Sequence, residues 1–211
     1  MKSKSQSRRP GRPPDAALPD RRRNQILDVA VGVFASRGYA ATDVQDIADQ
    51  VGVGKGTVYR YFGSKEELFL AAADRGMQRL SEAVHSHANQ AKDPLGRLAA
   101  AIHSYLAYFD EHPDLVELLI QERAVFKDRG QPTYFQHRDA NLGPWRELFR
   151  ELIRDGQVRD IPVSRITDII SDLLYGTIFT NHFANRRKRL ATQAKDVLDI
   201  LFHGILSEGD A

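Results

Sequence analysis

Two short helical patterns that flank the segment Gly52-Val53-Gly54 constrain the fold more strongly than any other feature of the sequence. The first places apolar side chains at the i, i+3, i+4 and i+7 positions of one helix face, at Val44, Ile47, Ala48 and Val51. Thr42 stands where the N-cap of this helix is expected, and Gly52 ends it. The second runs from Lys55 to Phe62 and stops at Gly63. Two short helices joined by a glycine turn are typical of a helix-turn-helix.

A helical wheel of the second helix separates an inward face from an exposed edge. At about 100° per residue, Val58 and Phe62 fall on the same side, which we expect to be buried. The opposite edge and its flanks carry Gly56, Thr57, Tyr59 and Arg60. Arginine can pair with a guanine edge, glycine lets a backbone approach closely, and hydroxyl groups can reach phosphate oxygens. This edge is therefore a candidate for reading the DNA major groove.

Helical patterns also precede and follow the motif. Residues Asp20 to Arg37 repeat apolar side chains every three or four positions, and Gly38 supplies a stop. Ser64 and Glu67 form the N-cap and N3 positions of a capping box that starts a further helix. Five more apolar stripes follow, at Leu95–Phe109, Leu115–Phe126, Trp145–Ile153, Ile166–Phe183 and Val197–Leu206. No alternating strand pattern occurs, so we expect an all-α fold.

Proline-containing segments are expected to separate the later helices, because proline lacks a backbone donor and disfavours helix in the preceding residue. These segments are Asp93-Pro94, His112-Pro113, Gly130-Gln131-Pro132, Gly143-Pro144 and Asp160-Ile161-Pro162. Residues 1–18 hold few large apolar side chains, so we expect a disordered basic arm there. The predicted organisation is this arm, a helix-turn-helix domain at 19–65 and a helical domain at 66–211.

Charge is distributed unevenly along the chain. Residues 1–65 hold 12 Lys and Arg against 6 Asp and Glu, a net charge of +6, whereas the remaining residues hold 18 against 22, a net charge of −4. A basic front end on a mildly acidic body is typical of a nucleic-acid-binding module joined to a part that does not touch phosphate. A solvated basic tail is the alternative interpretation.

Several other classes of protein are excluded by what the sequence lacks. The chain has no cysteine, which rules out disulfides, thiolate metal sites and cysteine nucleophiles and fits a reducing cytoplasm. No apolar run reaches the roughly 18 to 20 residues of a membrane helix. We therefore expect a cytoplasmic protein with no membrane partner.

Enzyme motifs are also missing. The segment Gly52–Thr57 superficially suggests a phosphate-binding loop, but Gly56 interrupts its Gly-Lys-Ser/Thr ending and a helical pattern precedes it where a strand is needed. No Gly-x-Ser-x-Gly or His-Glu-x-x-His motif is present, and His85 and His87 are expected to be surface histidines. We predict no catalytic residues, no metal, no cofactor and no enzyme activity.

The segment from residue 20 to 75 resembles the signature of the TetR family of transcriptional regulators. The resemblance rests on Asp46-Ile47-Ala48, Val51-Gly52-Val53, Gly56-Thr57-Val58-Tyr59-Arg60-Tyr61-Phe62 and Ser64-Lys65-Glu66-Glu67-Leu68. Carried over to the matching positions, it implies DNA contacts by Thr42, Gln45, Lys55, Gly56, Thr57, Tyr59, Arg60, Tyr61 and Lys65. One departure is Gly54, which stands where the family often has serine or a similar polar cap. Glycine is tolerated at an N-cap, so we expect a small stability cost and no loss of binding.

The same resemblance implies a function. It points to a homodimer that binds a palindromic double-stranded DNA operator, usually as a repressor, and releases it when a small-molecule effector binds. Residues 66–211 would then sense the ligand and form the dimer. The alternative is a helical protein-binding scaffold or co-regulator without sequence-specific DNA binding.

Arginines outside the motif are further candidates for DNA contact. Arg9 and Arg12 lie in a Pro-rich segment whose Gly-Arg-Pro centre resembles an AT-hook, which lies in a narrow minor groove. A disordered solubilising tail is the alternative for this segment. Arg22 belongs to a cluster at the start of the first helix, which we interpret as a clamp on the DNA backbone.

The last two helical stripes are apolar around more of their circumference than one core contact requires. Pairing both with their symmetry mates in a four-helix bundle would bury them, so we expect a two-fold homodimer. The middle of the body is rich in aromatic side chains that could line a cavity for an apolar or amphipathic effector. The candidates are Tyr105, Phe109, Glu122, Phe126, Trp145, Phe149, Tyr175 and Phe179.

Overall fold

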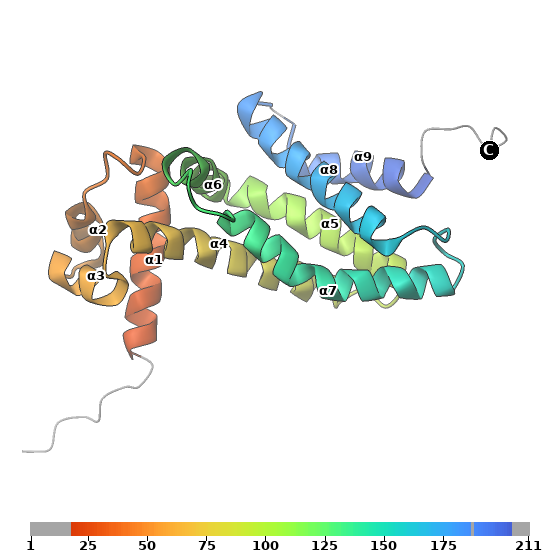
Figure 1. Ribbon diagram of the computed structural model, residues 1–211, viewed down its shortest axis with the longest axis horizontal. Helices are drawn as coiled ribbons and strands as arrows, with labels where there is room; N and C mark the ends of the chain where they lie inside the picture. Colours follow the sequence, from red (N-terminus) through yellow and green to blue (C-terminus); the bar gives the residue numbers. More distant parts are fainter. Residues whose placement is uncertain (1–17, 187, 204–211) are drawn as a thin grey trace, which may run out of the picture.

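The computed structural model describes residues 18–186 and 188–203, and all regular structure in that part of the chain is helical (Figure 1). In chain order the helices are α1 (Leu18–Arg37), α2 (Val44–Val51), α3 (Lys55–Phe62), α4 (Lys65–Ala88), α5 (Pro94–Glu111), α6 (Pro113–Val125), α7 (Thr133–Arg154), α8 (Val163–Phe183) and α9 (Leu190–His203). The prediction of an all-α fold is confirmed. No helix within these ranges is long and apolar enough to cross a membrane. Arg9, Arg12 and the rest of the predicted arm before Leu18 lie outside the described residues.

The turn before α2 differs from the prediction in its capping residue. Asp43 is the N-cap, because its backbone is extended (φ −91°, ψ 132°) and its carboxylate accepts a 2.8 Å hydrogen bond from the Gln45 amide. Thr42 is buried, and its hydroxyl donates to the Gly38 carbonyl at 2.8 Å. The prediction of Thr42 as the cap was wrong because Asp43, one residue nearer the helix, has a carboxylate that reaches the first free amide.

The first residues of α3 and α4 agree with the prediction from the sequence. Gly54 is the N-cap of α3 and makes no side-chain hydrogen bond there. Ser64 is the N-cap of α4, and its hydroxyl accepts a 3.0 Å hydrogen bond from the Glu67 amide. Between α2 and α3, Gly52 has φ 72°, a left-handed conformation that glycine adopts without steric cost. These capping residues determine where α2 ends and where α3 and α4 begin.

Helix α7 contradicts the prediction of a break at Gly143-Pro144. It runs without interruption from Thr133 to Arg154, with Pro144 in its interior. An internal proline removes one helical hydrogen bond and crowds the preceding turn, which costs about 3 kcal/mol. Leu142 and Leu148, on either side of the proline, are both buried in the body. Tertiary packing of the flanking turns therefore holds the helix together where local propensity would end it.

Two apolar clusters hold the helices together, and α4 contributes to both. One packs α1, α2, α3 and the first part of α4, and it includes Leu118 of α6. The other takes in α5, α7, α8 and α9 and begins on α4 at Met77. Figure 1 shows α4 running from the helix-turn-helix into the body, so this helix is part of both regions. The change of cluster falls between Ala73 and Met77. The domain boundary at 65/66 stays a prediction.

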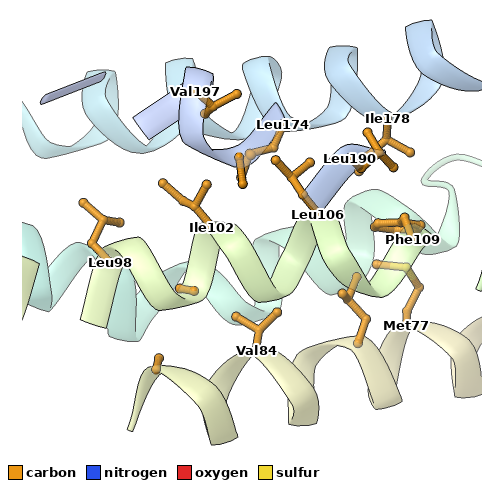
Figure 2. Close-up of a cluster of buried hydrophobic side chains, with 14 of the residues drawn as sticks. Met77, Val84, Leu98, Ile102, Leu106, Phe109, Leu174, Ile178, Leu190 and Val197 are labelled. Carbon is orange, nitrogen blue, oxygen red and sulfur yellow. The ribbon is translucent and has the colours of Figure 1, made fainter. Parts of the chain in front are cut away.

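Helix α5 lies at the centre of the body. Figure 2 shows Leu106 and its apolar neighbours on α5 between Met77 and Val84 of α4 on one side and side chains of α8 and α9 on the other. Leu106 is 0% exposed. Burying a leucine of this kind contributes about 1.5–3 kcal/mol, so the body is stabilised mainly by helices packed around α5.

Candidate functional site

Helix α3 has the two faces that the wheel predicts. Val58 and Phe62 are 1% and 5% exposed and pack in the first apolar cluster. The opposite edge carries the exposed residues Gly56, Tyr59 and Arg60, with Thr57 and Tyr61 half-buried beside them. A Cβ added at Gly56 would meet no atom within 4 Å, so the space in front of this residue is open. One face of α3 therefore anchors it, and the other is free to meet a ligand.

The exposed edge of α3 adjoins polar side chains from α2 and from the start of α4. We call the whole set the reading surface: Gln45, Lys55, Gly56, Thr57, Tyr59, Arg60, Tyr61 and Lys65. Thr42 is not part of it, because the Thr42 side chain is buried and its hydroxyl is bonded to a backbone carbonyl. The reading surface combines two lysines and an arginine with no carboxylate among its own members.

Lys55 is held in an exposed ion pair. Its ammonium lies 2.7 Å from Oδ1 of Asp43, the cap of α2. The hydrogen bond from the Gln45 amide, followed by that from Lys55, lowers the pKa of the Asp43 carboxyl. The same ion pair raises the pKa of Lys55. A phosphate that approached Lys55 would therefore compete with a carboxylate that stays charged at neutral pH.

Basic residues of α1 and α4 brace the motif. The Arg22 guanidinium lies 3.5 Å from the Val51 carbonyl at the end of α2, and that of Arg23 lies 5.2 Å from the centroid of the Phe62 ring. The Lys65 ammonium donates to the Ala40 carbonyl at 3.2 Å. These contacts fix the orientation of α2 and α3 relative to α1 while leaving positive charge at their edges.

A cavity of about 140 Å³ lies in the body between α4, α5, α7 and α8. Of the predicted ligand residues, Tyr105, Trp145 and Phe149 line it. The other predicted residues, which do not line it, are Phe109, Glu122, Phe126, Tyr175 and Phe179. Aliphatic side chains form another large share of the wall, among them Leu80 and Val84 of α4 and Leu98 and Ile102 of α5.

Glu122 has a structural role that its sequence position does not reveal. It is 2% exposed, and its Oε1 accepts hydrogen bonds from the amide and hydroxyl of Thr133 at 2.9 and 3.0 Å. Arg129 forms an ion pair with the same oxygen. The carboxylate thus joins the end of α6 to the start of α7, away from the cavity.

The remaining predicted aromatics pack elsewhere. Phe126 meets Tyr39 edge-on at 5.0 Å, next to the first apolar cluster. Tyr175 lies 4.3 Å from Phe179 between ring centroids and 4.8 Å from Tyr134, in an aromatic group beside the cavity. Their helical spacing is typical of side chains that line a cavity. Spacing alone does not show which of the inward-facing side chains reach the cavity and which pack against another helix.

Several polar residues of the cavity were missed by sequence reasoning. They are Ser81 and His85 of α4 and Arg138 and Asn141 of α7. His85 was expected on the surface, but it is half-buried, lines the cavity and has its ring centroid 5.5 Å from that of Trp145. The i, i+4 spacing of Ser81 and His85 could have indicated that both face the body, because the two residues lie along the edge of the apolar face of α4.

Two hydrogen bonds cross from α7 to α4 at the cavity. The Ser81 hydroxyl donates to Asn141 Oδ1 at 2.6 Å. Nε2 of His137 lies 2.7 Å from Oδ1 of Asp74. A ligand that pushed these helices apart would have to stretch or break both contacts.

Gln121 of α6 connects the body to the helix-turn-helix. Its side-chain amide donates to the Phe34 carbonyl of α1 at 3.0 Å and accepts from the Tyr39 amide at 2.9 Å. The same side chain also donates to Glu117, whose other oxygen lies 3.4 Å from His182 Nε2 of α8. Polar contacts therefore run from the end of α1 through α6 to α8.

Helices α8 and α9 expose large apolar side chains. Ile169 and Phe183 of α8 are 61% and 70% exposed, and Ile200 and Phe202 of α9 are 48% and 41% exposed. Monomeric proteins rarely leave several large apolar residues exposed on neighbouring helices, so this face is a candidate for protein contact.

Comparison with known proteins identifies the first part of the chain. Residues 26–72 match the family model described as bacterial regulatory proteins, tetR family. The chain is 34% identical over 106 residues to the transcriptional activator FasR of Mycolicibacterium smegmatis, a match that covers 50% of the chain and about half of that protein, 48%. It is 34% identical over 144 residues to the transcriptional regulator Mb3439c of Mycobacterium bovis, covering 61% of the chain and 73% of that protein.

Similarity extends over the body as well. The transcriptional repressor KstR2 of Mycobacterium tuberculosis is 29% identical over 163 residues, covering 74% of the chain and 80% of KstR2. The structure of the regulator FadR from Bacillus subtilis in complex with stearoyl-CoA matches with a TM-score of 0.67 and 23% identity over 87% of the chain and 99% of FadR. At this identity the likeness concerns the fold alone. All of these proteins are described as regulators, and none as an enzyme.

Proposed function

Because the chain belongs to the TetR family of bacterial transcriptional regulators, and is not an enzyme, we propose that it is a repressor that binds a palindromic DNA operator as a homodimer. A small apolar or amphipathic ligand in the body cavity would release it. The observation that carries this proposal is the geometry of α3. Its buried face holds Val58 and Phe62, while Gly56 and Arg60 stand on an open edge.

The reading surface supports specific roles for its residues in the major groove. Arg60 would pair with a guanine edge, and Gly56 would let the α3 backbone approach the bases. Lys55, Tyr59, Tyr61 and the other polar members, Gln45, Thr57 and Lys65, would contact phosphates or base edges. Arg22 and the predicted arm arginines would add contacts to the DNA backbone and minor groove.

The exposed apolar face of α8 and α9 supports the dimer. A two-fold axis that pairs these helices with their copies would bury Ile169, Phe183 and Ile200 in a four-helix arrangement. Two copies of α3 would then face successive major grooves, about 34–36 Å apart, as a palindromic site requires. Because the proposed target is chromosomal DNA, we also propose a cytoplasmic location.

The size of the cavity supports release by expansion. A cavity of about 140 Å³ is close to the roughly 150 Å³ that accommodates benzene in an engineered apolar core. A fatty acyl chain, such as the stearoyl group bound by FadR, is much larger. Such a ligand would have to separate α7 from α4 and break the Ser81–Asn141 contact. Since α4 continues into the helix-turn-helix, its displacement would alter the distance between the two copies of α3.

Recovery of bound genomic DNA, followed by a screen for releasing compounds, tests this function. We expect one palindromic sequence to be enriched, with affinity that falls steeply as salt rises, because several phosphates are neutralised. Compounds with an apolar portion larger than benzene should release it. Binding without sequence preference would contradict the proposal and favour the protein-binding scaffold.

A further inference from the structure

Two tyrosines of the cavity wall bring their hydroxyl groups together. The hydroxyl oxygens of Tyr105 on α5 and Tyr134 on α7 are 2.7 Å apart, and both residues line the cavity. Tyr134 is 4% exposed. Aromatic neighbours enclose the pair, with Phe109 edge-on to Tyr105 at 5.4 Å and Tyr175 at 4.8 Å from Tyr134. The two phenols therefore meet in an apolar setting.

The tyrosine pair has one more hydroxyl hydrogen than its own hydrogen bond uses. Two phenols carry two hydroxyl hydrogens, and the contact between them uses only one. Among the described residues, no other protein atom accepts a hydrogen bond from either hydroxyl. One O–H donor in the cavity wall is therefore without a protein acceptor, and a buried donor in that condition favours a ligand that supplies one.

The other hydroxyl groups of the cavity are already committed, and the Asn141 side chain makes two hydrogen bonds of its own. Ser81 donates to Asn141, and the Asn141 amide donates to the His137 carbonyl at 2.8 Å. The hydroxyls of Thr167 and Ser171 donate to backbone carbonyls of α8. The tyrosine pair thus stands out as the hydroxyl donor that the protein does not satisfy.

The two phenols carry no charge of their own. Burial raises the pKa of both phenols, that of Tyr134 to about 12, so both stay neutral at physiological pH. Arg138 also lines the cavity, but its guanidinium is already engaged by an ion pair with Asp139 at 2.8 Å and lies 5.0 Å from the centroid of the Phe135 ring. A neutral acceptor fits this donor better than a carboxylate, because burying a charge without a committed partner is costly.

We infer that the Tyr105–Tyr134 pair donates a hydrogen bond to the carbonyl oxygen of a neutral, largely apolar ligand. The ligand class is a ketone, ester or thioester whose carbonyl reaches the tyrosine pair. The inference rests on the proposed function, because it assumes that the cavity is where the effector binds. It adds that the effector is recognised through a carbonyl group and not by apolar shape alone.

Two probes of nearly the same shape test the inference. Cyclohexanone carries a carbonyl where methylenecyclohexane carries a CH2 group, and both suit a cavity that holds a benzene-sized group. Trp145, the only tryptophan of the chain, lines the cavity and reports binding by its fluorescence. The quantity to compare is the ratio of the two affinities in the full-length protein. In the Tyr105→Phe/Tyr134→Phe double variant, we expect the affinity for cyclohexanone to fall about tenfold relative to the affinity for methylenecyclohexane.

Tyr108→Phe is the matched control. Tyr108 lies on the same helix as Tyr105, but its hydroxyl is directed to the Gly76 carbonyl at 3.5 Å, and it does not line this cavity. The affinity ratio should not change in this variant. Retained binding of methylenecyclohexane by the double variant also shows that its cavity is intact.

A measurement on the unaltered protein covers the case in which the double variant does not fold. The C=O stretching frequency of bound cyclohexanone should lie below its value in hexane, as for a hydrogen-bonded ketone. A frequency equal to that in hexane, or an unchanged affinity ratio in a folded double variant, overturns the inference but leaves the cavity as a ligand site. Tighter binding of cyclohexanecarboxylate than of cyclohexanone also overturns it. If none of the three probes changes Trp145 fluorescence, the proposed ligand site fails as well.

Discussion

The reading surface and the cavity hold their polar groups in opposite ways. On the reading surface, Lys55 and Lys65 are paired in exposed contacts that water and salt can enter. In the cavity, Ser81 and Asn141 are bonded across two packed helices. On the proposed function, the first site would respond to charge, and the second to the volume and hydrogen bonding of its ligand. A ligand would then change DNA affinity by moving the helices that join the two sites.

Those connections are α4 and α6, and α6 contributes Leu118 to the first apolar cluster as well as Gln121. Helix α4 contributes to both apolar clusters, and Gln121 bonds the body to the backbone of Phe34 and Tyr39. Substitutions that alter one region at a time, with DNA binding and ligand response both measured, show how far the two regions act separately.

Truncation of the α5 core should have the largest effect and should act on stability. Leu106→Ala is expected to lower the free energy of unfolding by about 2–5 kcal/mol, because the site is fully enclosed. Urea unfolding followed by Trp145 fluorescence and by circular dichroism measures it. The control Val125→Ala, at a 42% exposed position, should stay within about 0.5 kcal/mol of the unaltered protein. Equal effects of the two substitutions would contradict the central position of α5.

Loss of the Gln121 contacts should separate the two regions functionally. Gln121→Leu keeps the size of the side chain but leaves the Phe34 carbonyl and Tyr39 amide without their partner. We expect the effect of a releasing ligand on operator affinity to shrink by about 2- to 30-fold. Gln193→Leu on α9 is the control, since among the described residues its side-chain amide donates to the Lys188 carbonyl and to no group of the helix-turn-helix. Release that is as strong in Gln121→Leu as in the control would show that the connection does not need the Gln121 hydrogen bonds and runs through the apolar packing of α4 and α6.

Removal of the competing carboxylate should strengthen DNA binding. Asp43→Asn keeps an N-cap oxygen for α2 but frees Lys55 from its ion pair. We expect tighter binding to any DNA at low salt, with a gain that fades as salt rises. Acid should mimic the substitution only below the lowered pKa of Asp43, where its carboxyl becomes neutral and releases Lys55. Asp196→Asn, on α9, should leave DNA affinity unchanged; a gain there would point to net charge alone.

The smallest effect is expected at the cap of α3. Gly54→Ser should raise stability by a few tenths of a kcal/mol, roughly the difference between glycine and serine caps. The backbone of Gly54 (φ −75°, ψ 148°) suits serine, and a Cβ added there meets no atom within 4 Å. Gly52→Ser, where φ is 72°, should destabilise the protein instead. Thermal unfolding of both variants distinguishes the two glycines, and equal shifts would contradict the cap assignment.

The helix-turn-helix was predictable because its pattern is local. Val58, Phe62 and their spacing within one helix determine which edge of α3 is exposed. The one error there, Thr42 for Asp43, is a shift of one residue between two good caps. The cavity was less predictable, because it is formed by four helices whose contacts the sequence does not specify. Pro144 inside α7 shows the same limit, since packing overrides the local preference.

The most direct test of DNA reading through α3 is a base-pair substitution scan of the enriched operator with the unaltered protein and with Arg60→Ala. If Arg60 reads a guanine edge, the unaltered protein should lose about 1–3 kcal/mol of binding for a change at one symmetric pair of positions. Arg60→Ala should become indifferent to the base there and keep its preferences elsewhere. An Arg60→Ala variant that binds every sequence more weakly by the same factor, with all base preferences intact, would contradict the assignment of α3 as the reading helix.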